Sequence, residues 1–347
     1  MDANNNKNIS RRQFLQTCGT VVAGIGAASG LGYLFHRTLV APANGDAART
    51  ATMVRSASGT PVNSPYKLVA AVQTDAPIDA FDRIGGLSVV ASDSALCFYN
   101  RAGKQTRVVP LDASPVRDLL TVNDERIYVL FPTSIAVYGS NGEQQLRWEA
   151  CSERSDYCSI AVSPKAVYVT DASNKNICQY TPDGRFVRFI DSPDGFIVPS
   201  YSFGIACAAD GSFYCSNPGR HRVEHYTADG TFIASFGQSG NDAGHFCGCC
   251  NPVYMAVTPE GDLLTSEKGI PRICCYDGQG AYRALLLDTR MMGGGHAAYR
   301  VKTNGAYLYV AGGTRISTFH YDPQTAAATA CGTCSRNECP LRAGITI

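Results

Sequence analysis

The sequence predicts an all-β chain folded as a six-bladed β-propeller, and two observations carry this prediction. A tyrosine followed by a polar, mostly glycine-bearing turn recurs six times along the chain, at intervals of about 40–50 residues, which is the length of a four-stranded propeller blade. Inside each repeat, Val, Ile, Tyr and Phe alternate with polar residues between turn signals, as they do in β-hairpins. The repeat tyrosines are Tyr99, Tyr138, Tyr180, Tyr226, Tyr276 and Tyr321.

Residues 1–43 are expected to be an address and not part of the fold. The pair Arg11 and Arg12 precedes an apolar Gly/Ala-rich run over residues 17–35, and small residues at 41–43 offer a cleavage site. This order resembles a twin-arginine signal peptide, which implies recognition by the twin-arginine translocase and a periplasmic or other extracytoplasmic location. The alternative is an uncleaved membrane anchor, because the apolar run nearly reaches the ~20 residues that a spanning helix needs.

Composition narrows the function classes. The 30 basic and 29 acidic residues nearly cancel, so nothing favours binding to nucleic acid or to an anionic membrane. The 15 cysteines are far more than usual, which in an oxidising compartment first suggests disulfides. Because the twin-arginine route is expected to carry folded cargo, metal loading before export stays equally open.

The rest of the chain divides into a linker, a propeller and a tail. Residues 44–65 are rich in Ala, Ser, Thr and Gly and are predicted to be a linker. The propeller is expected over residues 66–325, with residues 67–72 supplying the missing fourth strand of blade six. A short cysteine-containing tail follows at 326–347. The loops between strands two and three, and between successive blades, should share one end of the propeller, here called the top face. All the unusual loops fall there, which predicts a functional top face.

One stretch of blade four resembles a known repeat family. Residues 217–237, NPGRHRVEHYTADGTFIASFG, are similar to an NHL repeat. The stretches FCGCCNP and SEKGIPRI are also similar to those of exported NHL propellers of uncharacterised role. The resemblance implies a six-bladed NHL-type propeller but no particular activity, because such propellers include binding proteins, lyases and lactonases.

The cysteines divide into packing positions and candidate sites. Five occupy strand positions that hold other small or apolar residues in most repeats, where a free cysteine packs as a small hydrophobe; these are Cys97, Cys178, Cys207, Cys215 and Cys274. The role of Cys275 stays open, since its side chain should point to the opposite face from Cys274. Cys151 and Cys158 flank the loop between blades two and three, which predicts a loop-closing disulfide, with free thiols as the alternative.

Two cysteine clusters are candidate metal or redox centres. Cys247, Cys249 and Cys250, in HFCGCCNP, lie in the loop between blades four and five. Because this loop is tight, at most two of these thiolates should face one centre, and the alternative is a disulfide that pins the loop. The second cluster lies in the tail and comprises Cys331, Cys334 and Cys339. Its C-x2-C-x4-C-P spacing is similar to iron–sulfur and zinc ligand runs, and the alternative is a disulfide-stapled tail.

Further polar residues are predicted on the same face as secondary binding residues. They are His221, His245, His296, Arg220, Glu267, Lys268 and Arg272. A nearby arginine or lysine favours a thiolate and could bind an anionic group, although solvated loop positions are the alternative.

Three functions are therefore compatible with the sequence. The first is an exported propeller with a cysteine-based iron–sulfur, zinc or redox centre, which passes electrons to a membrane redox partner or another protein. The second is a non-enzymatic propeller that binds a protein or a small ligand and uses its cysteines structurally. The third is a metal lyase or hydrolase. It is the weakest of the three, because the sequence shows no Ser/His/Asp order in a catalytic context and no phosphate-binding glycine loop. No catalytic residue is assigned.

Overall fold

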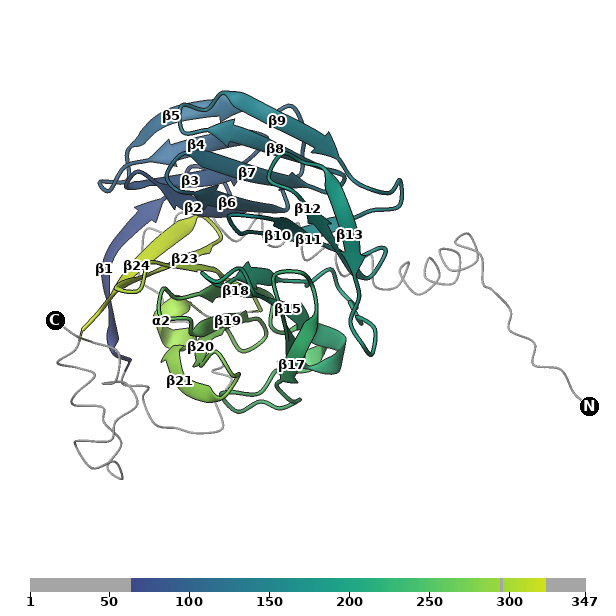
Figure 1. Cartoon of the computed structure of the whole chain (residues 1–347). Helices are drawn as coiled ribbons and strands as arrows, with labels where there is room; N and C mark the ends of the chain where they lie inside the picture. Colours follow the sequence, from purple (N-terminus) through teal and green to yellow (C-terminus); the bar gives the residue numbers. More distant parts are fainter. Residues whose placement is uncertain (1–63, 294–295, 323–347) are drawn as a thin grey trace, which may run out of the picture. The chain divides into compact units, whose positions relative to one another are not determined.

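Six four-stranded antiparallel sheets make up the part of the chain that the computed structural model describes, residues 64–293 and 296–322 (Figure 1). The prediction of an all-β, six-bladed propeller is confirmed. The predicted leader, most of the predicted linker, and the tail with Cys331, Cys334 and Cys339 lie outside the described residues. No helix among the described residues is both long enough and apolar enough to cross a membrane.

The strands follow the repeat in order. Blade one has β2 (Ala80–Ile84), β3 (Leu87–Ser92), β4 (Ala95–Tyr99) and β5 (Gln105–Pro110); blade two has β6 (Asp118–Val122), β7 (Arg126–Phe131), β8 (Ser134–Gly139) and β9 (Gln144–Glu149). Blade three has β10 (Tyr157–Val162), β11 (Val167–Asp171), β12 (Asn176–Tyr180) and β13 (Phe186–Ile190); blade four has β14 (Ile205–Cys207), β15 (Phe213–Asn217), β16 (Arg222–Tyr226) and β17 (Phe232–Phe236). Blade five has β18 (Tyr254–Val257), β19 (Leu263–Glu267), β20 (Arg272–Tyr276) and β21 (Tyr282–Leu287); blade six has β22 (Arg300–Thr303), β23 (Tyr307–Gly312) and β24 (Arg315–Tyr321). Short helices stand only in loops: η1 (Pro218–Arg220), η2 (Gly248–Cys250) and α2 (Thr289–Met292).

The N-terminal strand closes the ring. Strand β1 (Tyr66–Gln73) pairs antiparallel with β24, from Tyr66 opposite Tyr321 to Gln73 opposite Arg315. The sixth sheet therefore has the order β22-β23-β24-β1, as the sequence predicts. The first strands of the blades also contact one another in a closed cycle, from β2 through β6, β10, β14, β18 and β22 back to β2. Because β1 and β24 pair in one sheet, the first and last strands of the propeller close the ring.

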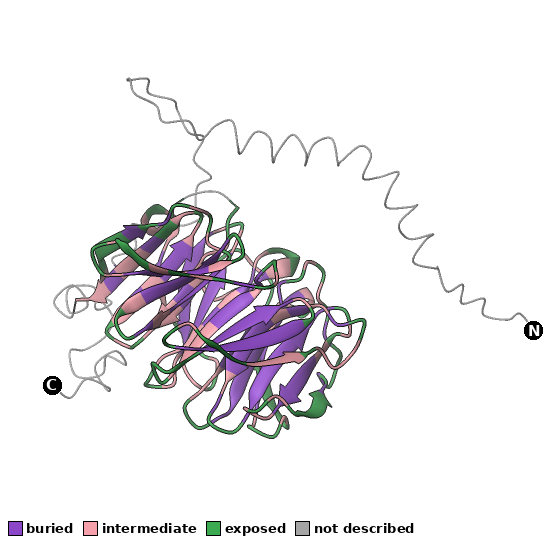
Figure 2. Ribbon diagram, turned by 90° about the horizontal axis from the view of Figure 1, so that it is seen from above, coloured by how far each residue is buried: buried purple, intermediate pink, exposed green. Residues whose placement is uncertain are grey.

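The core lies between the blades. Six hydrophobic clusters are present, and each is shared by two neighbouring blades. Figure 2 shows the buried residues concentrated along the strands, with exposed residues in the loops and outer strands. Strand β12 illustrates the alternation behind this pattern, because Cys178 packs toward blade two while Ile177 packs toward blade four. Each blade thus buries both faces against its neighbours.

The turns between the third and fourth strands explain the recurrent Asp-Gly signal. Gly184 in TPDG has a φ of 89°, a conformation that side chains with a Cβ rarely adopt. A Cβ at this position would also lie 2.7 Å from the ring of Trp148. Glycine at this turn therefore satisfies both the backbone and the packing between blades two and three.

Candidate functional site

The cysteine loop, residues 245–252, connects β17 to β18 on the top face. Asn251 fixes its shape, because its side-chain amide donates to the carbonyl oxygens of Cys247 at 2.7 Å and of Lys268 at 2.9 Å. The amide oxygen of Asn251 in turn accepts a hydrogen bond from the backbone N–H of Lys268 at 2.9 Å. Since Asn251 is buried, it ties the cysteine loop firmly to the loop between β19 and β20.

Two of the three thiols in this loop lie together. The Sγ atoms of Cys249 and Cys250 are 3.5 Å apart. Cys249 is exposed and Cys250 is half-buried, where the hydroxyl of Ser200 donates to its sulfur at 2.6 Å. The sulfur of Cys247 instead lies beside the carbonyl oxygen of Lys268 at 3.6 Å. The loop therefore presents an adjacent pair, here called the vicinal dithiol (Cys249 and Cys250), with Cys247 apart from it.

The two thiols of the pair differ in acidity. Burial raises the pKa of Cys250, but hydrogen bonds from Ser200 and Cys249, together with the charge of Lys268, outweigh that effect and leave the pKa lowered. The pKa of Cys249 is raised, because it hydrogen-bonds to Cys250 and would place a second negative charge beside it. A thiol with a lowered pKa next to a second thiol suits thiol–disulfide exchange, because the thiolate is the attacking species.

The donor set of the described residues does not fit a metal. Within the described residues, 64–293 and 296–322, no group of three or more His, Cys, Asp or Glu side chains is arranged to hold a metal ion. A structural zinc site uses four such ligands, and the cysteine loop brings only two thiols together. Among the described residues, the loop therefore offers a pair of thiols.

Glu267 and Arg272 form a buried ion pair. Their side chains are 2.8 Å apart and are 0% and 5% exposed. Arg272 also donates to the carbonyl oxygens of Asn241 at 2.7 Å and His245 at 2.6 Å. Burial raises the pKa of Glu267, and Arg272 offsets part of this rise. The two charges thus neutralise each other, and Arg272 holds the backbone that leads into the cysteine loop. The sequence instead predicts both as binding groups at the surface.

The other predicted top-face residues make local contacts. Nδ1 of His221 lies 3.2 Å from the carbonyl oxygen of Phe246, and the ring of His245 contacts Gln238. Arg220 donates from Nε to the carbonyl oxygen of Gly195 at 3.0 Å. The ring of His296 and the sulfur of Cys247 both lie beside Gly269, at 3.4 and 4.0 Å from where its Cβ would be. Of the predicted charged loop residues, Lys268 is the one that acts on the dithiol.

The thiols of Cys151 and Cys158 are both free in the structure, so the disulfide expected between them stays a prediction, and their packing does not favour it. Cys151 packs in the hydrophobic cluster between blades two and three, and Cys158 packs in the cluster between blades three and four. The sheet of blade three separates them. The pairing register shifts between Tyr157 and Ser159, and this irregularity at Cys158 is not visible in the sequence pattern.

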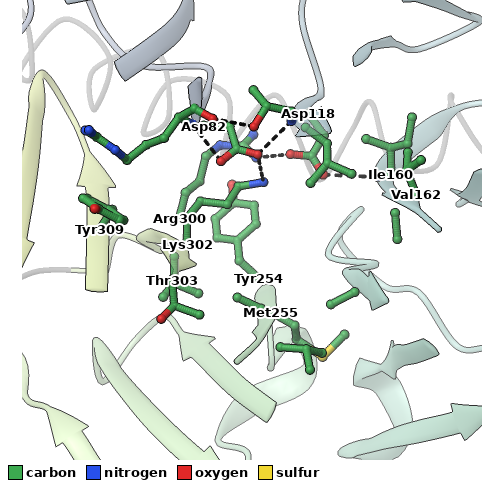
Figure 3. A pocket seen from close by; sticks show the side chains of 18 of the residues that line it. Asp82, Asp118, Ile160, Val162, Tyr254, Met255, Arg300, Lys302, Thr303 and Tyr309 are labelled. Carbon is green, nitrogen blue, oxygen red and sulfur yellow. Dashed lines mark hydrogen bonds and ion pairs between the residues drawn. The ribbon is translucent and has the colours of Figure 1, made fainter. Parts of the chain in front are cut away.

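Sequence reasoning misses a cavity of about 540 Å³ in the centre of the ring, lined by the first strands of the blades (Figure 3). Its wall at blades one, two and six carries two ion pairs, Lys302–Asp82 at 3.2 Å and Arg300–Asp118 at 2.9 Å. Arg300 also lies over the ring of Tyr254 at 4.5 Å. The available signal was charge in strands that are otherwise apolar, as in DLLTV and RVKT.

The opposite wall of this central cavity is apolar. It includes Ile160, Val162 and Met255 from blades three and five. The carboxylate of Asp118 is fully engaged, because Oδ2 also accepts from the Ser159 hydroxyl at 2.6 Å and Oδ1 from the backbone N–H of Leu119 at 2.9 Å. The charges on the polar wall therefore link inner strands around the ring, with Lys302–Asp82 joining blades six and one and Arg300–Asp118 joining blades six and two.

Comparisons with known proteins agree with this architecture. No protein-family model and no curated protein matches the chain. Among solved structures, virginiamycin B lyase from Staphylococcus aureus superposes with a TM-score of 0.52 at 15% identity, over 74% of this chain and 99% of the lyase. A catalytically inactive variant of that lyase with quinupristin gives 0.52 at 14% identity, over the same shares.

A protein of unknown function from Bacteroides thetaiotaomicron is similar to the same extent, with a TM-score of 0.53 at 12% identity over 74% of this chain and 72% of its own. At identities this low, structural likeness establishes the fold and leaves the activity undecided. The chain is a six-bladed β-propeller of the same fold as these proteins.

Proposed function

We propose that this chain is an exported six-bladed propeller whose top face carries a thiol-based redox site, the vicinal dithiol. The observation that carries the proposal is the 3.5 Å contact between the sulfurs of Cys249 and Cys250, with one thiol exposed and the other acidified. Export rests on the arginine pair Arg11 and Arg12 and the apolar run behind it. In an extracytoplasmic compartment, the dithiol would exchange electrons with a disulfide of a protein partner or a membrane redox partner.

The proposed reaction is thiol–disulfide exchange. The Cys250 thiolate attacks one sulfur of the partner's disulfide, forms a mixed disulfide and releases the other partner sulfur as a thiolate. Cys249 then loses its proton to that thiolate and attacks the sulfur of Cys250. The second partner sulfur leaves as a thiolate and takes a proton from the solvent. That proton replaces the one that Cys250 released when its thiolate formed. Two thiols of this chain are oxidised, and one partner disulfide is reduced to two thiols.

Capture by a trivalent arsenical tests this proposal, because such reagents bridge two neighbouring thiols. The protein would carry serine in place of Cys331, Cys334 and Cys339, so that the tail cannot contribute, and in place of Cys151, whose sulfur lies 3.2 Å from that of Cys178. We expect one phenylarsine oxide per chain, lost in both Cys249→Ser and Cys250→Ser and retained in the matched control Cys247→Ser. Retention in the Cys250→Ser variant, or absence of capture in a folded parent, would contradict the proposal.

The tail cysteines stay a separate prediction of an iron–sulfur or zinc centre. Elemental analysis and a visible spectrum of the full-length chain would detect it. Cys334→Ser should lower the bound metal without unfolding the propeller, because the tail follows the last blade. An unchanged metal content would contradict the tail assignment and leave the dithiol proposal untouched.

Ligand binding in the central cavity is the second candidate function. It is favoured by the volume of about 540 Å³ and by the contrast between a charged and an apolar wall. Native mass spectrometry of the protein from its own source would reveal a bound small molecule. Val162→Trp, which fills the cavity, should remove it, and a mass unchanged between parent and variant, apart from the substitution, would contradict this alternative.

A further inference from the structure

A second pair of sulfurs lies far from the cysteine loop, inside the interface between blades two and three. The Sγ atoms of Cys151 and Cys178 are 3.2 Å apart. Cys151 follows β9, whereas Cys178 stands in the middle of β12, and both belong to the hydrophobic cluster that also contains Tyr128. Two sulfurs at this separation need only a small side-chain adjustment to reach bonding distance, which is about 2.05 Å.

The pairing is specific to this blade. Cys97 and Cys274 occupy the same repeat position as Cys178, two residues before the repeat tyrosine. Among the residues that the structure describes, neither of them has a sulfur within contact distance, and the only other sulfur pair is the vicinal dithiol. Cys158, which is closer to Cys151 in sequence, packs on the opposite face of the sheet. Blade three therefore differs from blades one and five in that a second cysteine, Cys151, lies beside the packing cysteine Cys178.

The two thiols differ in access. Cys151 is half-buried, whereas Cys178 is buried, and its pKa is raised by burial and by the neighbouring sulfur of Cys151. The hydroxyl of Tyr157 lies 3.6 Å from the sulfur of Cys151 and accepts a hydrogen bond from its backbone N–H at 3.2 Å. A soluble oxidant can therefore reach Cys151 first, and Cys178 reacts through it.

We infer that Cys151 and Cys178 form a disulfide that fastens the loop between blades two and three to blade three. The oxidant is a disulfide, either oxidised glutathione or a disulfide of a thiol oxidoreductase. Cys151 attacks one sulfur of this oxidant and releases one thiol, which carries away the Cys151 proton. Cys178 then attacks the Cys151 sulfur of the mixed disulfide and releases the second thiol with its own proton. Two protein thiols become one disulfide, and one oxidant disulfide becomes two thiols.

Tryptic mapping can decide this inference, because Cys151, Cys158 and Cys178 fall in three separate peptides. Cleavage after Arg147, Arg154, Lys165, Lys175 and Arg185 gives 148–154 with Cys151, 155–165 with Cys158 and 176–185 with Cys178. The folded protein, with Cys249 and Cys250 replaced by serine, would be incubated with oxidised glutathione, alkylated and digested without reduction. The serine background makes the result independent of the vicinal dithiol.

We expect peptide 148–154 linked to 176–185, and the same link when Cys158→Ser is added as the matched control. Cys151→Ser should abolish the link and leave Cys178 unalkylated until the protein is denatured. A link from 148–154 to 155–165 would overturn the inference. So would a lasting glutathione adduct on Cys151, or alkylation of both thiols after oxidation. Because the parent itself is mapped, failure of a variant to fold does not remove the test.

Discussion

At the scale of the residue, the proposed function depends on how neighbouring groups change the pKa of one thiol among many. Most described cysteines lie in hydrophobic clusters, and burial raises the pKa of Cys158, for example, to about 12. Cys250 is the exception, because a hydroxyl, a thiol and a lysine all favour its thiolate. The difference lies in the loop geometry that brings Ser200 within 2.6 Å of its sulfur. At Cys250, local hydrogen bonds and charge therefore outweigh the effect of burial on the pKa.

Removing the hydroxyl at Ser200 should weaken this effect. In Ser200→Ala the pKa of Cys250 is expected to rise, because the thiolate loses a hydrogen-bond donor. The thiolate fraction then falls at neutral pH, so the pH profile of Cys250 alkylation should move toward higher pH. The rate at Cys247 in the same protein serves as the control and should not change. An unchanged profile at Cys250 would show that Ser200 does not set its acidity.

At the scale of the element, the buried pair Glu267–Arg272 joins strands β19 and β20 to the approach of the cysteine loop. Through Asn241 and His245, Arg272 fixes the backbone that leads into the loop. A charge removed from one side of such a pair leaves the other buried without compensation, which typically costs about 3–5 kcal/mol. Glu267 and Arg272, which the sequence predicts as binding charges, thus support the backbone that leads into the cysteine loop.

Arg272→Met should therefore lower the free energy of unfolding by about 3–5 kcal/mol. The matched control is Arg185→Met, which breaks the ion pair with Asp183 whose side chains are 79% and 59% exposed, and which should cost no more than about 1 kcal/mol. Urea denaturation of both variants and the parent provides the measurement. Equal losses in the two variants would mean that the Glu267–Arg272 pair is not a special support.

At the scale of the whole molecule, the ring depends on one strand from the N-terminal side of the fold. Without β1, the edge of β24 exposes unpaired backbone groups, which invite pairing between chains. A chain that starts at residue 75 should therefore unfold at lower temperature and self-associate, while one that starts at residue 64 should stay monodisperse. Thermal unfolding and size-exclusion chromatography would measure this, and identical behaviour of the two chains would show that closure by β1 is dispensable.

The sequence is informative about this architecture because the signals of a propeller are local. Repeat tyrosines, Asp-Gly turns and alternating strands specify six blades, and the short sixth repeat requires a strand such as residues 66–73 to complete it. The face of the sheet to which each side chain points is harder to predict from the sequence. One irregular residue in a strand reverses the face of every residue that follows it. The register shift at Cys158 is one such irregularity, and the contact of the loop residue Cys151 with Cys178 of β12 is not visible in the sequence pattern. The charged wall of the cavity likewise emerges only when inner strands of distant repeats meet.

The most direct test of the vicinal dithiol as a redox site is an equilibrium titration of its thiols. The protein with serine at Cys331, Cys334 and Cys339 would be equilibrated in glutathione and dithiothreitol buffers that together span potentials on both sides of about −300 mV, then alkylated and mapped. We expect the alkyl groups on Cys249 and Cys250 to appear together, with a midpoint potential above about −300 mV, as for exposed, exchangeable disulfides. Two outcomes would contradict a redox role for the cysteine loop. In one, both thiols stay alkylatable at every potential; in the other, the disulfide is still not reduced when the buffer potential falls below about −300 mV.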